Sequence, residues 1–178
     1  ALRLLDMTID HNVITGTSGI QYGGGVYIGG AAAISNTTFS NNTARTDGGG
    51  VFVLSTSVVT NSTFSQNQAS TGNGGGARLV GDAVVNGALF LTNTAVTAGG
   101  VVFDSMSTVT NTQFNNNSAA STGAAGGAYF NGISSLTNVT FTQNSAGSQG
   151  GGGAVFVGST ALSGGAFMSN TAAFAGGG

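Results

Sequence analysis

One pattern repeats along the whole chain and restricts the fold more than any other feature. Each complete repeat contains a glycine run, two apolar residues separated by one position, a variable stretch, and a phenylalanine followed by x-x-Asn-x-Ala. Repeats start near residues 23, 48, 74, 98, 125 and 151, and a seventh is split between residues 1–22 and 176–178. A period of about 25 residues is typical of solenoid proteins, in which each repeat stacks on the next.

Aligning the repeats gives four columns. The aromatic column contains Ile9, Phe39, Phe64, Phe90, Phe114, Phe141 and Phe167. Three residues later, the Asn column contains Asn12, Asn42, Asn67, Asn93, Asn117, Asn144 and Asn170. Two residues further on, a small-residue column contains Ile14, Ala44, Ala69, Ala95, Ala119, Ala146 and Ala172. Five residues before the aromatic column, an aliphatic column contains Leu4, Ile34, Val59, Val85, Val109, Leu136 and Leu162.

The repeat predicts strands and excludes helices. The chain has 33 glycines among 178 residues, and each glycine costs about 1 kcal/mol inside a helix. The apolar pair that follows each glycine run, such as Val51 and Val53, has the two-residue period of a strand. We therefore predict one all-β domain over residues 1–178, a parallel β-solenoid of about seven coils of about 25 residues.

In such a solenoid, equivalent residues stack along the axis. The aromatic column predicts an internal stack, and the Asn column predicts a turn ladder, because an amide both donates and accepts hydrogen bonds. Asn also tolerates the left-handed conformation that a sharp corner needs. Glycine pairs such as Gly49 and Gly50 predict a positive φ or a close backbone approach. A further column predicts a second, broken polar ladder: Asp6, Asn36, Asn61, Gly87, Asn111, Asn138 and Gly164.

These motifs resemble the repeats of chlamydial polymorphic outer-membrane proteins, and similar repeats occur in many large bacterial surface proteins. The matching segments are GGVY (24–27), GGVF (49–52), GGVV (99–102), FSNN (39–42), FSQN (64–67), FNNN (114–117) and FTQN (141–144). The resemblance covers essentially the whole chain. It implies a right-handed parallel β-helix and a secreted or surface-displayed role as an adhesin or passenger.

Composition excludes several classes of function. Three arginines and no lysine cannot form the basic footprint of a nucleic-acid binder. With no cysteine and one histidine, the chain lacks the ligands for a zinc or iron–sulfur site and cannot form a disulfide. We therefore expect no metal and no cofactor. No apolar run is long enough to span a bilayer as a helix. Net charge is only −2, which gives weak repulsion between copies and suits an extracellular or cell-surface rod.

The rival hypothesis is a carbohydrate-active β-helix enzyme, which needs clustered carboxylates. Of the five aspartates, only Asp82 and Asp104 are expected in adjacent coils at similar positions, with Arg78 nearby. We interpret this group as solvated loop charges and expect no catalytic residue. His11, between Asp10 and Asn12, is interpreted as an exposed turn residue rather than a proton shuttle.

A second rival is a binding face for ice or glycans. Positions beside the aromatic column are rich in hydroxyls and are expected to face outward: Thr37, Thr38, Ser62, Thr63, Thr112 and Thr140. The array is interrupted at Ala88 and Leu89 and again at Gly165 and Ala166. We therefore favour an ordinary solvated β-surface here.

The ends of the chain carry no recognisable polar cap, although solenoid ends normally need one. Residues 1–12 align with the middle of a coil, and the final glycines align with the start of one. Two hypotheses follow: a window from a longer solenoid, or subunits that stack head to tail into a fibre. Both make the protein non-enzymatic and structural, either a fibre subunit or the stalk of an adhesin. Its partners are then other copies, flanking coils, or a host surface or its glycans.

Overall fold

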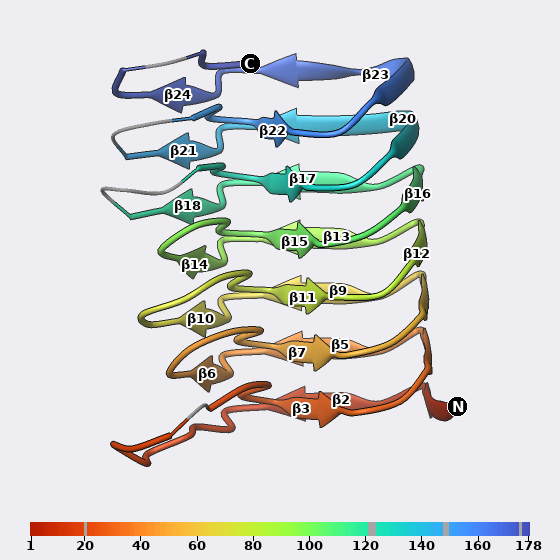
Figure 1. Ribbon diagram of the computed structural model, residues 1–178, viewed down its shortest axis with the longest axis vertical. Coiled ribbons are helices and arrows are strands. Elements are labelled where there is room, and N and C mark those ends of the chain that lie inside the picture. Colours follow the sequence, from red (N-terminus) through yellow and green to blue (C-terminus); the bar gives the residue numbers. More distant parts are fainter. Residues whose placement is uncertain (20, 121–123, 148–149, 175) are drawn as a thin grey trace.

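The computed structural model describes residues 1–19, 21–120, 124–147, 150–174 and 176–178, and these form a stack of β-coils (Figure 1). Three parallel sheets run along the long axis of the stack, and each strand pairs with its counterpart in the next coil. In the part of the chain that the structure describes, no helix is long and apolar enough to cross a membrane.

Sheet A has 12 strands and two halves, which the long strands β20 (Ser134–Thr142) and β23 (Thr160–Met168) join. The first half contains β1 (Leu2–Leu5), β4 (Ala32–Ser35), β8 (Ser57–Thr60), β12 (Ala83–Asn86) and β16 (Ser107–Thr110). The second half contains β2 (Thr8–Asp10), β5 (Thr38–Ser40), β9 (Thr63–Ser65), β13 (Leu89–Leu91) and β17 (Gln113–Asn115). Each half therefore has seven members, one from each predicted coil.

Sheets B and C have six strands each and close the coil. Sheet B contains β6 (Thr43–Ala44), β10 (Gln68–Ala69), β14 (Thr94–Ala95), β18 (Ser118–Ala119), β21 (Ser145–Ala146) and β24 (Thr171–Ala172). Sheet C contains β3 (Val26–Ile28), β7 (Val51–Val53), β11 (Ala77–Leu79), β15 (Val101–Phe103), β19 (Ala128–Phe130) and β22 (Ala154–Phe156).

The pairing register places identical residue types above one another in the core. Phe39 pairs with Phe64, which pairs with Phe90, and the rings stack 4.7–4.9 Å apart. The stack continues through Phe114 and Phe141 to Phe167, the last at 4.7 Å. Such regular burial of aromatic and aliphatic columns is the main stabilising contribution in a chain with so few charges.

The bend between sheets A and B, which we call the Asn corner, is made by two residues in each coil. The second is the Asn of the invariant column, buried in the middle coils, as at Asn67 and Asn93. The left-handed residue is the one before it, for example Gln66 (φ 56°) or Thr92 (φ 56°). The prediction that the column Asn itself takes this conformation is wrong, because its side chain must point inward to reach the ladder.

A second bend, the kink, divides sheet A into its halves. Its left-handed residues form the predicted second polar column, as at Asn36 (φ 49°) and Gly87 (φ 67°). At the kink, the left-handed residue and the residue before it both face outward, so the residue after them points into the core. Thr37, Ser62 and Thr112 are therefore buried, and the prediction that they face outward is wrong. Thr38, Thr63 and Thr140 do remain partly exposed.

The third bend brings the chain from sheet B into sheet C through the glycine runs. A Cβ added to Gly49 would lie 2.3 Å from the backbone oxygen of Gly75, so neighbouring coils pass too closely for any side chain. The positive φ at this bend belongs to the preceding residue, Gly48 (φ 65°).

Candidate functional site

Three polar or concave features were candidates for a site: a charged cluster over sheet C, the Asp10–His11 pair in the first coil, and a groove over the first half of sheet A. The charged cluster is centred on Arg78, in the middle of β11 on its outward face. Its Nε donates to Asp104 Oδ2 at 2.8 Å, and its Nη1 donates to Asp47 Oδ2 at 2.9 Å.

The two carboxylates of this cluster are held by several donors. Asp47 is 6 % exposed, and its Oδ1 also accepts from the backbone N (2.7 Å) and Nδ2 (2.8 Å) of Asn73. Burial by itself would lower the pKa of Arg78, but the hydrogen bonds and charges of Asp104 and Asp47 outweigh it and raise the pKa. The cluster therefore fastens the loop at residues 45–48 onto sheet C, with one guanidinium shared between two carboxylates.

Asp82 does not join this cluster. Its Oδ1 accepts from Ser105 Oγ at 2.6 Å, whereas Arg78 binds Asp104 and Asp47. The predicted proximity of Asp104 to Arg78 is present, and Asp82 contacts Ser105, the residue that follows Asp104. The prediction missed Asp47, which the loop before β7 brings to the arginine. Sequence spacing carries no signal for such a loop, because it lies outside the repeating columns.

The Asp10–His11 pair is exposed, with side-chain exposures of 40 % and 74 %. Asp10 Oδ1 accepts from Ser40 Oγ at 2.5 Å and from Asn41 Nδ2 at 3.1 Å, and its Oδ2 lies 2.6 Å from His11 Nδ1. These hydrogen bonds, Ser40 first, lower the pKa of Asp10 to about 2. His11 is the left-handed residue of the first Asn corner (φ 55°), which agrees with its interpretation as a turn residue.

Sequence reasoning also missed the outward column of sheet C, where loops cover apolar residues. Phe52 is 3 % exposed and stacks on Tyr22 at 4.3 Å and on Tyr27 at 5.6 Å. Val102 is likewise buried against Ala98 and Ala125. The signal was present as an apolar residue between the two inward positions of the triplets, as in Val51-Phe52-Val53.

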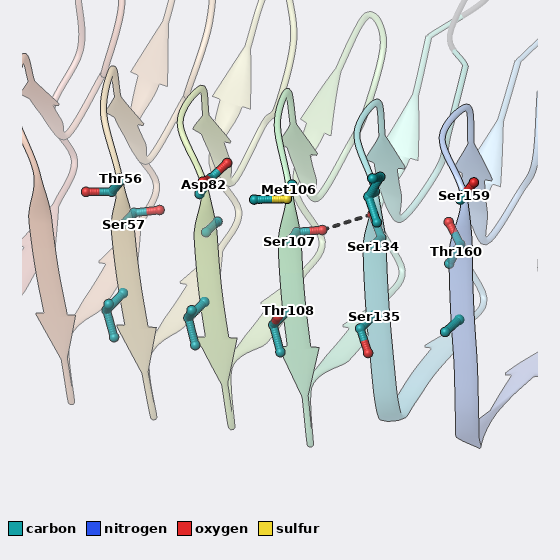
Figure 2. Close-up of a pocket in the computed structure, with 15 residues that line it drawn as sticks. Thr56, Ser57, Asp82, Met106, Ser107, Thr108, Ser134, Ser135, Ser159 and Thr160 are labelled. Carbon is teal, nitrogen blue, oxygen red and sulfur yellow. Dashed lines mark hydrogen bonds between the residues drawn. The ribbon is translucent and has the colours of Figure 1, made fainter.

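The groove lies over the first half of sheet A and has a volume of about 770 Å³ (Figure 2). It crosses β8, β12, β16, β20 and β23, and its lining is mainly aliphatic and hydroxyl side chains. In the described part of the chain, no three His, Cys, Asp or Glu side chains come close enough to hold a metal ion.

The comparisons with known proteins identify the fold family. The family model described as the right-handed beta helix region matches residues 5–171. The protein belongs to the right-handed beta helix family. Searches of the curated proteins and of the solved structures find no similar chain.

Family membership confirms the predicted fold class, including the right-handed winding of the coils. In this right-handed beta helix, the charged cluster lies over sheet C and the groove lies over sheet A. The two features therefore face different sides of the coil, and each has to be considered separately as a possible site.

Proposed function

We propose that this β-helix is a non-catalytic structural rod outside the cell, serving as a fibre subunit or as the stalk of a surface adhesin. The observation that carries the proposal is the continuity of the Asn ladder. The backbone N and Nδ2 of each column Asn donate to Oδ1 of the Asn in the next coil, as from Asn67 to Asn93 (both 3.0 Å). The same bonds run from Asn12 at one end to Asn170 at the other.

The end coils support a rod that continues by stacking. Leu162 and Phe167 are 53 % and 39 % exposed, whereas Leu136 and Phe141, their counterparts one coil earlier, are 2 % and 0 % exposed. A further coil, from the same chain or from another copy, would bury these side chains. Burying a large apolar side chain contributes about 1.5–3 kcal/mol, so the end coils favour association.

The ladder also has a direction that suits head-to-tail stacking. Each column Asn presents its Oδ1 to the coil before it and its backbone N–H to the coil after it. A coil placed on the last one would therefore receive the donors of Asn170. A coil placed before the first would donate to Asn12.

The non-catalytic part of the proposal is supported by the engagement of the candidate carboxylates. Asp104 and Asp47 are paired with Arg78, and Asp82 is bound by Ser105. A general acid or base needs a carboxyl group within reach of a substrate proton, with a pKa suited to the working pH. Depolymerisation of a polysaccharide that disappears on Asp82→Ala or Asp104→Ala would overturn this part.

Electron microscopy of the chain at several concentrations tests the rod. Unbranched fibres with a subunit repeat of about 34 Å, seven coils of about 4.8 Å, are expected for a fibre subunit. Rods of a single length at every concentration would assign the chain to a stalk instead. Phe167→Asp, which places a charge on the open end coil, should abolish the fibres while the far-ultraviolet circular dichroism stays unchanged. Fibres that persist in this variant would contradict growth by coil stacking.

A further inference from the structure

Three Asn-Gly pairs occur in the chain, and the structure places them in different surroundings. They are Asn73–Gly74, Asn86–Gly87 and Asn131–Gly132. In such a pair the glycine backbone nitrogen can attack Cγ of the preceding Asn, because glycine has no side chain to obstruct the approach and its backbone is permissive. In a folded protein the attack requires that both the Asn amide group and the glycine nitrogen are free to move.

The Asn86–Gly87 pair is restrained at both reacting groups. Asn86 Oδ1 accepts from Thr110 Oγ1 at 2.9 Å and from Asn111 Nδ2 at 3.0 Å. The attacking nitrogen, Gly87 N, donates to Thr110 O at 3.0 Å. The attack therefore requires these three hydrogen bonds to break, although the Asn86 side chain is exposed to solvent.

The Asn73–Gly74 pair is restrained at one reacting group. Asn73 Nδ2 donates to Asp47 Oδ1 at 2.8 Å, and Asn73 N donates to the same oxygen at 2.7 Å. These hydrogen bonds hold the amide group against the charged cluster. Gly74 N donates to no residue that the structure describes, so the attacking nitrogen is free while the amide group is not.

The Asn131–Gly132 pair is free at both reacting groups. It lies in the turn between β19 and β20, where the exposed Asn131 side chain makes no hydrogen bond to a described residue. Gly132 N also has no acceptor in the described part of the chain. Asn131 N donates to Phe103 O at 2.9 Å, so the backbone before the pair is anchored while the amide group can turn toward Gly132 N.

We propose that Asn131 is a site of spontaneous deamidation, carried out by the chain itself. Gly132 N loses its proton and forms a bond to Cγ of Asn131, the bond from Cγ to Nδ2 breaks, and Nδ2 leaves as ammonia with that proton. Water then opens the succinimide ring at either of its carbonyl groups and gives isoaspartate or aspartate. The reaction consumes water, releases ammonia and involves no oxidation or reduction.

The new carboxylate would lie beside the charged cluster over sheet C. Strands β15 and β19 pair in parallel, with Phe103 beside Phe130. The residues that follow them, Asp104 and Asn131, therefore lie in adjacent coils about 4.8 Å apart. The guanidinium of Arg78 is already shared between two carboxylates. Like charges on neighbouring strands are destabilising, so the modification would weaken the coil on the side that the cluster holds.

Peptide mass mapping of the folded protein during incubation at mildly alkaline pH tests the site. The mass increase from replacing NH2 by OH should appear at Asn131 about tenfold or more faster than at Asn86, because three hydrogen bonds restrain the Asn86 pair. Asn73 should react at an intermediate rate. An isoaspartyl methyltransferase with a labelled methyl donor should label the peptide that contains residue 131.

Two controls separate the effect of the fold from that of the local sequence. In urea the hydrogen bonds are lost, so all three Asn-Gly pairs should react at similar rates. Asn131→Gln should remove the fast reaction and leave the far-ultraviolet circular dichroism unchanged. Asn131→Asp, which is one of the two products, should melt about 1–3 °C below Asn131→Ser at low salt, and the difference should shrink at high salt.

Three results would overturn the proposal. The first is an Asn131 that stays intact in the folded protein over the time in which the unfolded chain reacts. The second is an equal rate at the three pairs in the folded protein, which would show that the surrounding contacts do not select the site. The third is the same melting temperature for Asn131→Asp and Asn131→Ser, which would show that a carboxylate here does not act on the charged cluster.

Discussion

Each coil has two bends with a left-handed residue, and the two bends differ in which of their residues is restricted to one chemical type. At the Asn corner the left-handed residue varies freely, and His11, Gln66 and Thr92 all occupy it, while the next residue is always Asn. At the kink the left-handed residue is always Asp, Asn or Gly, while the next residue varies, from Thr37 to Val139.

The difference shows which atoms each bend depends on. At the Asn corner the buried amide ladder stabilises the bend. Its hydrogen bonds offset the cost of a left-handed Thr or Gln, about 1–2 kcal/mol. At the kink the following residue lies in a hydroxyl column with gaps. Thr37 N donates to Ser62 Oγ (3.1 Å) and Ala88 N donates to Thr112 Oγ1 (3.3 Å), but Ala88 and Val139 have no hydroxyl to continue it. Local backbone preference therefore selects the residue at the kink.

Replacing a ladder Asn should have the largest effect. Asn93→Gly removes the acceptor of Asn67 N and Nδ2 and the donor to Phe64 O (2.8 Å) in a fully buried place. Each buried group left unsatisfied costs about 1–3 kcal/mol, so we expect a loss of about 3–5 kcal/mol in urea unfolding.

Asn111→Gly is the matched control at the kink. Asn111 is left-handed (φ 48°), exposed, and bonded through Nδ2 to Asn86 Oδ1 at 3.0 Å. Glycine keeps the backbone conformation and loses only exposed hydrogen bonds, so its cost should stay below about 1 kcal/mol. Equal losses in the two variants would contradict the assignment of the buried ladder as the stabilising element of its corner.

Filling the gap in the kink column should stabilise the protein. In Ala88→Ser, the new hydroxyl oxygen would accept a hydrogen bond from Ser62 N, as Ser62 Oγ accepts one from Thr37 N. We expect the free energy of unfolding to rise by about 0.5–1.5 kcal/mol. Ala95→Ser is the control, because it buries a hydroxyl in the small-residue column behind the Asn corner, where Ala95 is 6 % exposed. Thermal denaturation should raise the midpoint for the first variant and lower it for the second; a lower midpoint for both would mean that the kink has no room for a hydroxyl.

Relieving the left-handed residue at the Asn corner should give a smaller gain. Thr92 is β-branched and exposed at φ 56°, whereas Asn41 and Asn116 occupy the same position in other coils. Thr92→Asn should add about 0.5–1 kcal/mol, and Asn116→Thr should remove a similar amount. If neither substitution changes the unfolding midpoint, the ladder has shifted the backbone at this corner enough to remove the strain.

The comparison of the two bends also explains what the sequence could predict. The columns gave the coil number and the parallel stacking, because burial repeats the same residue types in every coil. They could not assign the left-handed residue of the Asn corner, because His11, Gln66 and Thr92 share no chemical type. They also placed Thr37 outward, because a strict two-residue alternation does not include the extra outward residue that the kink inserts.

The candidate sites were harder to predict because they depend on contacts outside the columns. Arg78 finds Asp47 only because a loop crosses sheet C. The groove depends on which outward residues of successive coils become neighbours, as Val84 and Thr108 do through the pairing of β12 with β16. Outward positions differ from coil to coil, so no column marks them, and only the register of the sheets brings them together.

The smallest expected effect concerns the first Asn corner, where Asp10 precedes the left-handed His11. The pKa of Asp10 is lowered from 3.8 to about 2, mainly by the hydrogen bond from Ser40. A carboxyl group with a depressed folded-state pKa stabilises the protein above its ordinary pKa, and this stabilisation disappears as the pH falls from 3.8 to about 2. Asp10→Asn should therefore reduce the loss of stability across this interval in urea unfolding, and Ser40→Ala should reduce it in part. If the parent protein and Asp10→Asn lose stability in parallel, the carboxylate does not help to hold the first coil on the second.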